Sequence, residues 1–323
     1  MANKLVFIPV SYKENFSMSA NVSHKKHNKS DLYLKNAIVA LKSVKINNPD
    51  VDVAIITNFP LTTFYHDILN KHNILQYQCD FIDYEMPPHF IWSLAFYKIT
   101  TIKWVIENLD YDFYLQLESD EICINSLDDM WKELESKILT VFSPFRYEHS
   151  NRVKYSKLFN EFNKSSTKVM IEKTGAGFIA GSKSLLKHFI EISNKVYNYI
   201  KERINEVSID IGDELYTSIY CALYPEKVGR ANPYADIYWT KNFYLVSTNY
   251  MYDPVSIIHL PSEKTSGLIY LYKYLVKRGK LPHKKKIYKI MGFPKSKPPF
   301  NFGLFIKRCI KGFSKRVLKI LNK

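Results

Sequence analysis

Cysteine is scarce in this chain. Its 323 residues include four cysteines, Cys79, Cys123, Cys221 and Cys309, which lie far apart and form no paired motif. A disulfide framework and a zinc knuckle both need closely patterned cysteines, so neither is indicated. We therefore expect the protein to work in a reducing, cytoplasmic location.

Long apolar runs are also missing. No stretch approaches the roughly 18 consecutive apolar residues that a membrane-spanning helix requires. The first apolar stretch, residues 5–10, is too short for a signal peptide, and no small-residue cleavage site follows it. It predicts a buried first strand instead. We expect a protein that is neither integral to a membrane nor exported by this route.

Acidic residues are almost absent from the C-terminal fifth. From residue 262 to residue 323 the chain carries a charge of +17, with Glu263 as its single acid, so the preceding 261 residues together carry −2. A basic groove for nucleic acid would normally belong to the folded body, and we expect no nucleic-acid partner. The charge division predicts a folded domain over residues 1–265 and a basic tail over residues 266–323.

The end of this tail has the pattern of an amphipathic helix. Between residues 304 and 321 one side is apolar, with Phe305, Ile306, Cys309, Ile310, Phe313, Val317, Ile320 and Leu321. Lysine and arginine occupy most of the rest, and such a helix binds in the interface of an anionic membrane. The alternative is a helix docked on the body with a solvated basic face. We expect residues 300–323 to hold the protein peripherally on the inner face of the plasma membrane.

Strands and helices alternate through the first half of the chain. Apolar patterns predict strands at 5–10, 51–57, 80–84, 113–117 and 138–142, and helices at 31–46, 60–69 and 91–108. This order is typical of an α/β fold with a mostly parallel, Rossmann-like sheet and helices on both faces. Loops after the first strands commonly take a nucleotide base, which we place near Val10, Ser11 and Asn58.

The most informative stretch follows the strand at 113–117. It ends in Glu118, Ser119 and Asp120, and ligands of open α/β sheets bind beyond the carboxyl ends of strands. Two carboxylates one residue apart can share a divalent cation, or one can hold the cation while the other accepts from a ribose hydroxyl. The alternative is an acidic strand end without a ligand. A helix start follows, with Ser126 as its predicted cap.

Residues 91–135 as a whole resemble the donor site of glycosyltransferase family eight. The shared features are a helix ending in a Tyr-Asp turn, a strand, an acid-x-acid triplet, and then Ser-Leu-x-x-Met-Trp. The resemblance implies a GT-A fold, a nucleotide-sugar donor that we expect to be a UDP-hexose, and Mn²⁺ or Mg²⁺ as cofactor. It also implies that Glu118 and Asp120 hold the metal and that Ser119 contacts the donor.

Further positions match the family less closely. The resemblance implies that His259, after an apolar strand, completes the metal site, and that Lys264 and Lys98 contact the donor phosphates. Lys264 stands one residue nearer the histidine than in the family, and Lys98 replaces an arginine. A lone histidine is more often structural, although an imidazole beside oxygen ligands suits Mn²⁺ better than Ca²⁺.

Two later segments also bear on the site. Residues 174–181 are predicted to form a glycine-dense strand. Its Gly175 stands where the family has an asparagine that contacts the donor sugar or the attacking hydroxyl. The segment 210–217 opens a predicted helix that runs to about residue 223. The resemblance implies that Asp213 or Glu214 faces the reacting sugar carbon, whereas acids in a first helical turn are also favoured by the helix dipole. The polar segment 143–166 is either an acceptor-binding lid or a surface excursion.

These features predict a metal-dependent, retaining glycosyltransferase that moves a hexose to a glycan or glycolipid acceptor, such as lipopolysaccharide or capsule. One alternative is an inverting GT-A enzyme, with or without a metal, that uses Asp213 or Glu214 as general base. Another is a non-catalytic, membrane-bound protein that has kept the fold with a degenerate site. Sugar, acceptor and linkage depend on loop geometry that spacing does not give.

Overall fold

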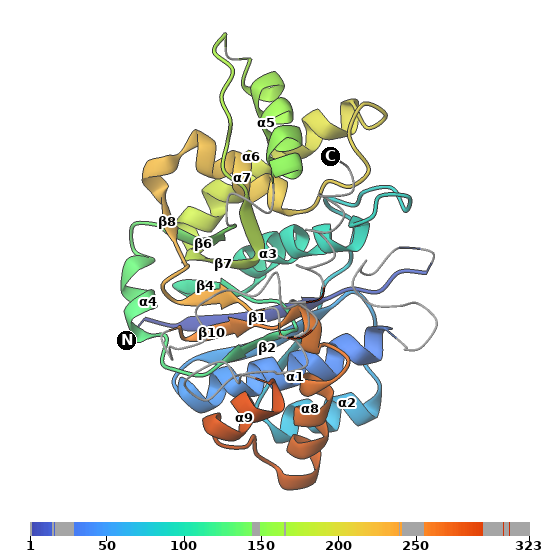
Figure 1. Ribbon diagram of the computed structural model, residues 1–323, viewed down its shortest axis with the longest axis vertical. Coiled ribbons are helices and arrows are strands. Elements are labelled where there is room, and N and C mark those ends of the chain that lie inside the picture. Colours follow the sequence, from blue (N-terminus) through green and yellow to red (C-terminus); the bar gives the residue numbers. More distant parts are fainter. Residues whose placement is uncertain are drawn as a thin grey trace.

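A computed structural model describes residues 2–14, 16, 29–143, 149–164, 166–238, 240, 255–292, 306 and 310. Its centre is a seven-stranded sheet of order β3-β2-β1-β4-β7-β6-β8 (Figure 1). The strands are β1 (Lys4–Val10), β2 (Asp52–Thr57), β3 (Leu75–Gln78), β4 (Phe113–Gln116), β6 (Ile138–Phe142), β7 (Thr174–Ser182) and β8 (Val228–Arg230). The first four pair in parallel, whereas β7 runs antiparallel to both β4 and β6.

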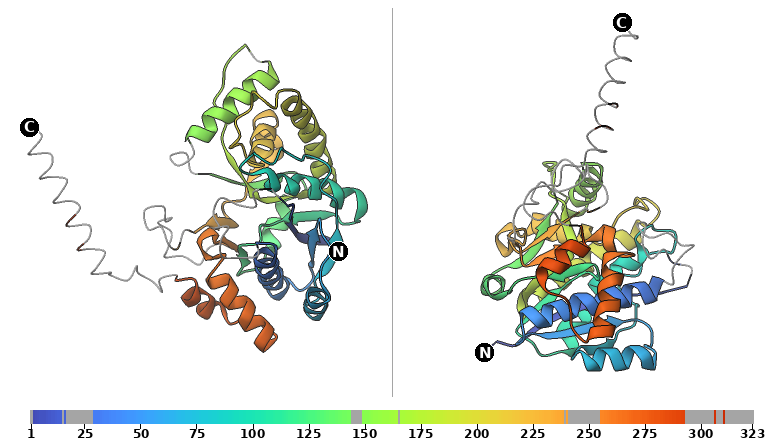
Figure 2. Two further views of the ribbon diagram at one scale, coloured as in Figure 1. Left: turned by 90° about the vertical axis from the view of Figure 1, so that its right-hand side faces the viewer. Right: turned by 60° about the horizontal axis from the view of Figure 1, so that its bottom comes forward.

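Helices cover both faces of this sheet, as Figures 1 and 2 show. One layer comprises α1 (Lys29–Asn47), α2 (Thr63–Lys71), α8 (Gly267–Arg278) and α9 (Lys284–Ile290). The other comprises α3 (Tyr97–Asn108), α5 (His149–Asn163), α6 (Lys183–Glu202) and α7 (Glu214–Leu223). The short helix α4 (Asp128–Glu133) packs into the core on the α1 side.

The strands explain the two layers. Alternate side chains of a strand point to opposite faces, so a strand covered on both sides must be apolar throughout. In β1, Val6 and Ile8 join the core beneath α1, while Leu5 and Phe7 join the core beneath α3. The resulting mostly parallel sheet with helices on both faces confirms the predicted fold class.

A second, smaller sheet adds segments from the later part of the chain. Its strands are β5 (Glu121–Cys123), β10 (Ile257–His259) and β9 (Ala235–Ile237), in that spatial order. β10 runs antiparallel to β5 and parallel to β9. This pairing places His259 directly opposite Glu121, immediately beyond the acidic turn that follows β4.

Three predicted elements differ from the structure. The third strand is Leu75–Gln78 rather than residues 80–84, because its half-exposed edge position lacks the apolar run that a central strand would show. The predicted helix at 91–108 begins as a turn and a short 3₁₀ helix, Ser93–Phe96, before α3. The helix expected at 210 begins at Glu214.

The core continues past residue 265. Apolar residues of α8 and α9 belong to the same cluster as α1 and the sheet, among them Leu268, Leu271, Leu275, Ile287 and Met291. Apart from Ile306 and Ile310, the predicted membrane-binding segment 300–323 lies outside the described residues. Within the described ranges, every helix is too short or too polar to cross a bilayer.

Candidate metal and nucleotide site

The first cavity of interest opens at the carboxyl ends of β1 and β4. The residues around it are Pro9, Val10, Ser11, Tyr33, Trp92, Leu94, Ala95, Tyr97, Lys98, Leu117, Glu118, Ser119, Asp120, Asp213, Glu214 and Lys264. It forms there because neighbouring parallel strands end at the same edge and leave a crevice between their loops. Six segments of the chain therefore meet at one cavity.

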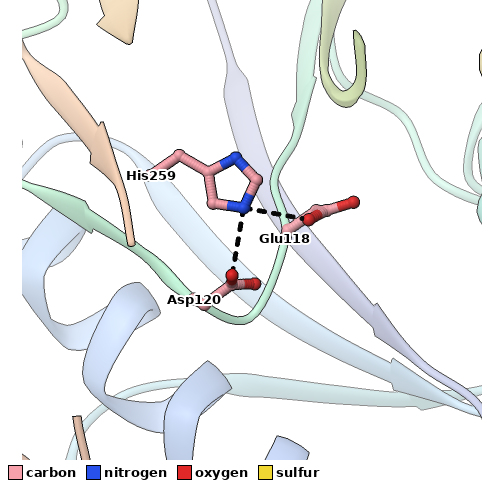
Figure 3. Close-up of side chains that lie close together, drawn as sticks. All are labelled: Glu118, Asp120 and His259. Carbon is pink, nitrogen blue, oxygen red and sulfur yellow. Dashed lines mark hydrogen bonds and ion pairs between the residues drawn. The ribbon is translucent and has the colours of Figure 1, made fainter. Parts of the chain in front are cut away.

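Three predicted metal ligands converge beside this cavity. Nε2 of His259 lies 3.0 Å from a carboxylate oxygen of Asp120 and 3.2 Å from one of Glu118 (Figure 3). A tight turn after β4 places both acids on the same side, and the backbone N–H of Leu260 donates to the carbonyl of Asp120 at 2.9 Å. The acidic turn is thereby tied to the end of β10, which carries the histidine.

These groups fit a divalent cation. One donor atom from each of Glu118, Asp120 and His259 can lie within 4.8 Å of the other two. Two carboxylate oxygens and one imidazole nitrogen suit Mn²⁺, whereas Mg²⁺ more strongly prefers oxygen ligands and waters. In the described part of the chain, this is the one cluster of at least three such residues with that spacing.

Two lysines balance the charge of the acids. Lys264, nearly buried, forms an ion pair with Asp120. Lys98 lies 2.7 Å from a carboxylate oxygen of Glu118 and 2.7 Å from one of Asp213. Burial alone would lower the pKa of Lys98, but Asp213 and Glu118 outweigh it and raise that pKa. Both lysines therefore stay charged beside the cavity.

The pKa values of the three predicted ligands reflect this balance. Burial would raise the pKa of Glu118, but Lys98 and His259 hold it well below its ordinary value. Lys264 and His259 likewise lower the pKa of Asp120. Burial would lower the pKa of His259, yet Asp120 and Glu118 raise it to about 10. The raised pKa favours the protonated form of the imidazole, whose Nε2 lies within 3.2 Å of an oxygen of each carboxylate.

Asp213 and Glu214 lie on the far side of Lys98. Burial raises the pKa of Asp213 to about 7, even though Lys98 opposes the shift. Glu214 is more exposed, and one of its oxygens lies 3.6 Å from the ammonium of Lys173. Both acids reach the cavity, because α7 points its N-terminal turn at the carboxyl end of the sheet.

A second cavity lies behind the metal ligands. It shares Trp92, Glu118, Glu214 and Lys264 with the first. Its other residues are Glu121, Val141, Ser143, Lys173, Gly175, Gly177, Phe178, Ala235, Asp236, Ile237, His259 and Pro261. Gly175 therefore borders the second cavity and not the first.

Of the three predicted base-binding residues, the structure places two beside the first cavity and one away from it. Val10 and Ser11 border the first cavity, and the hydroxyl of Ser11 donates to the carbonyl of Leu94 at 3.2 Å. Asn58 is not among the residues around it. Its amide oxygen accepts from the N–H of Tyr12 at 2.8 Å and its amide nitrogen donates to the Tyr12 carbonyl at 2.9 Å. Asn58 thus shapes the loop after β1.

Sequence reasoning missed Glu121, Lys173 and Asp236, all of which border the second cavity. Burial, together with Glu118 and Asp120, raises the pKa of Glu121 to about 8 despite the opposing charge of His259. A signal was present for Glu121, since a charged residue opens the otherwise apolar strand Glu121–Cys123. Lys173 lies in a polar segment, and Asp236 is the middle residue of Ala235–Ile237, a strand too short to show a pattern in the sequence.

Comparison with known proteins identifies the fold class. No family model matches the sequence, and no curated protein matches it. Among solved structures, the chain is similar to an active-site mutant of LgtC, with a TM-score of 0.54 and 14% identity over 89% of this chain and 99% of that one. The protein therefore has a GT-A-type α/β fold.

A second similar structure is the galactosyltransferase LgtC in complex with donor and acceptor sugar analogues. It has a TM-score of 0.53 and 14% identity, over 91% of this chain and 98% of that chain. At this identity the similarity establishes the fold. Membership of glycosyltransferase family eight stays a prediction.

Proposed function

We propose that the chain is a metal-dependent glycosyltransferase that moves a hexose from a nucleotide sugar, a UDP-hexose, to a glycan or glycolipid acceptor. The observation that supports this most is the convergence of Glu118, Asp120 and His259 beside a cavity at the carboxyl ends of β1 and β4. A cation there would lie next to two charged lysines. A diphosphate is the ligand that this combination of charges favours.

The donor would lie across the first cavity, with its base toward Val10 and Ser11 and its diphosphate near Ser119. A Mn²⁺ ion held by Glu118, Asp120 and His259 would neutralise charge on the leaving diphosphate, so that no proton needs to be supplied. Lys264 would assist at the phosphates.

The hexose would lie between the diphosphate and the N-terminal turn of α7. There Asp213 and Glu214 offer carboxylates that can stabilise positive charge developing on the reacting sugar carbon. The pair Lys98–Asp213 would hold one of these acids in place at 2.7 Å. In the retaining reaction that we propose, the acceptor hydroxyl attacks from the face that the nucleotide leaves.

A second candidate is an inverting transferase with Asp213 as general base. It is favoured by the pKa of Asp213, raised by burial to about 7, since a base works best when its pKa lies near the operating pH. The anomeric configuration of the product, determined by NMR, separates the two mechanisms. Retention of configuration excludes direct displacement by a base-activated hydroxyl.

The acceptor would enter from the second cavity, where Gly175 and Gly177 leave room beside the acids. For its location we propose the cytoplasmic face of the plasma membrane, with residues 300–323 on anionic lipid and a lipid-linked acceptor of lipopolysaccharide or capsule type. The lysine-rich sequence 284–289 in α9 supports this, because it extends the basic character of the tail onto the folded body.

The proposed function is tested by incubating the protein with UDP-galactose or UDP-glucose and measuring UDP release, with Mn²⁺ and with EDTA. We expect release that depends on Mn²⁺. Asp129→Asn, which changes an exposed acid on α4, serves as the control and should release UDP at the wild-type rate. A protein that neither hydrolyses these donors nor binds UDP with Mn²⁺ would instead be a non-catalytic relative of the fold.

A further inference from the structure

Glu121 is a buried carboxylate outside the predicted ligand set. It is the first residue of β5, and 2% of its surface is exposed to solvent. In the register of the small sheet it lies directly opposite His259 on β10. A buried carboxylate is costly unless its oxygens have partners, so the contacts of Glu121 indicate its role.

The two oxygens of Glu121 face two parts of the metal site. Oε2 accepts a hydrogen bond from the backbone N–H of Glu118 at 3.1 Å. Oε1 lies 3.7 Å from Nδ1 of His259. A single side chain therefore contacts the acidic turn with one oxygen and faces the imidazole with the other.

The orientation of the imidazole explains why the position of Oε1 near Nδ1 matters. Nε2 lies between Glu118 and Asp120, and Nδ1 is on the opposite side of the ring (Figure 3). A neutral histidine that binds a metal through Nε2 carries its proton on Nδ1. Metal-binding histidines commonly direct that N–H at a carboxylate, which fixes both the tautomer and the ring orientation.

The neighbouring strand leaves space for this arrangement. A Cβ added at Gly177 on β7 would lie 3.2 Å from Cδ of Glu118 and 3.4 Å from Oε1 of Glu121. Glycine at this position lets both carboxylates pack against the strand. The position of Glu121 is thus determined from three sides, by Glu118, His259 and Gly177.

We propose that Glu121 is a positioning residue, which holds the imidazole of His259 so that Nε2 faces the cation site. The inference rests on the proposed function only in that the cation site belongs to it. Glu121 itself would not bind the cation. It would act through the imidazole of His259, which is the proposed ligand.

The test is a titration of Mn²⁺ in the presence of UDP, followed by electron paramagnetic resonance of the free ion. Glu121→Gln keeps the size of the side chain and an oxygen for the N–H of Glu118, but it replaces the carboxyl group opposite His259 with an amide. We expect Mn²⁺ to bind about 10- to 100-fold more weakly. Asp129→Asn, which changes an exposed carboxylate on α4, should keep the wild-type affinity.

A double-mutant cycle separates positioning from a merely structural role. If Glu121 acts through the imidazole, Glu121→Gln should cost little further affinity in a His259→Ala background. An equal loss with and without the histidine would overturn the proposal. So would an unchanged affinity in the single variant.

A second variant covers the case in which Glu121→Gln does not fold. Glu121→Asp keeps the carboxyl group but withdraws it from His259 by one methylene, and we expect a smaller loss of Mn²⁺ affinity. Undiminished affinity in this variant would overturn the proposal. Wild-type protein that binds no Mn²⁺ with UDP would overturn the proposed function as well, whereas normal wild-type binding and an unaffected variant would overturn the role of Glu121 alone.

Discussion

Lys98 lies between Glu118 and Asp213, with its ammonium 2.7 Å from a carboxylate oxygen of each. The lysine comes from the first turn of α3, Glu118 from the turn after β4, and Asp213 from the residue before α7. It joins the predicted metal ligands to the acid that we place near the sugar. The ammonium of Lys98 thereby links the proposed metal site to the proposed sugar site.

Replacing this lysine should affect both stability and transfer. Lys98→Met leaves the buried carboxylate of Asp213 and the partly exposed one of Glu118 without their shared partner. Because the Asp213 carboxylate is buried, we expect the free energy of unfolding to fall by about 3 kcal/mol. Urea unfolding measures this, and UDP release should fall together with it. Lys103→Met on the same helix, which breaks the more exposed pair with Asp83, should cost under about 1 kcal/mol. Equal losses in the two variants would contradict the special position of Lys98.

Asp120→Asn should abolish Mn²⁺-dependent UDP release. The amide keeps the size of the side chain but loses the charge that Lys264 and His259 contact. We expect the rate to fall by at least about 100-fold, as for removal of a group that stabilises transition-state charge. Circular dichroism checks that the fold is retained. Wild-type turnover in this variant would remove the assignment of the site.

Gly177→Ala should weaken Mn²⁺ binding. The new methyl would lie 3.2 Å from Cδ of Glu118, so that carboxylate must move by a few tenths of an ångström. Gly175→Ala is the matched control on the same strand, because its nearest neighbour would be 3.7 Å away, an ordinary contact. Titration with Mn²⁺ and UDP compares the two. Similar affinities in both variants would show that the space at 177 does not matter to the ligands.

The metal-free protein should lose stability between pH 6.5 and pH 9. The pKa of His259 is raised to about 10, so its stabilising contribution is complete below its unfolded pKa near 6.5 and fades as the pH rises toward 10. The carboxyl groups of Asp213 and Glu121 act in the same direction, since their pKa values of about 7 and about 8 penalise ionisation in the folded state.

Thermal unfolding in EDTA at the two pH values measures this effect. His259→Ala should show a smaller difference between them, because the variant lacks the contribution of the imidazole. A melting temperature that stays constant or rises with pH in the wild-type protein would contradict the charge arrangement.

Removal of residues 300–323 should abolish binding to anionic liposomes. Seven lysine and arginine residues lie in this segment, and each contributes about 1 kcal/mol near such a surface. Sedimentation with phosphatidylglycerol vesicles should pellet the full chain but not the truncated one. Binding of the full chain should weaken with salt and be absent on neutral phosphatidylcholine. Equal binding of the two proteins would place the membrane contact elsewhere.

The sequence by itself determined the local features of the site. Apolar runs that alternate with helical patterns predicted the α/β fold, because burial on both faces of a sheet requires strands that are apolar throughout. The abrupt change after Leu117 marked Glu118 and Asp120 as strand-end acids. The edge strand β3 and helix α5 were missed, since half-exposed or polar elements have little apolar periodicity.

Only the tertiary structure decided which distant residues meet at those acids. His259 reaches them because β10 pairs with β5, and Lys98 reaches Asp213 because α3 and α7 pack on the same face of the sheet. The pairing of β10 with β5 also buries Glu121 against His259. Residue patterns report burial within one element, whereas the partners of each element depend on which edges and faces the rest of the chain leaves open.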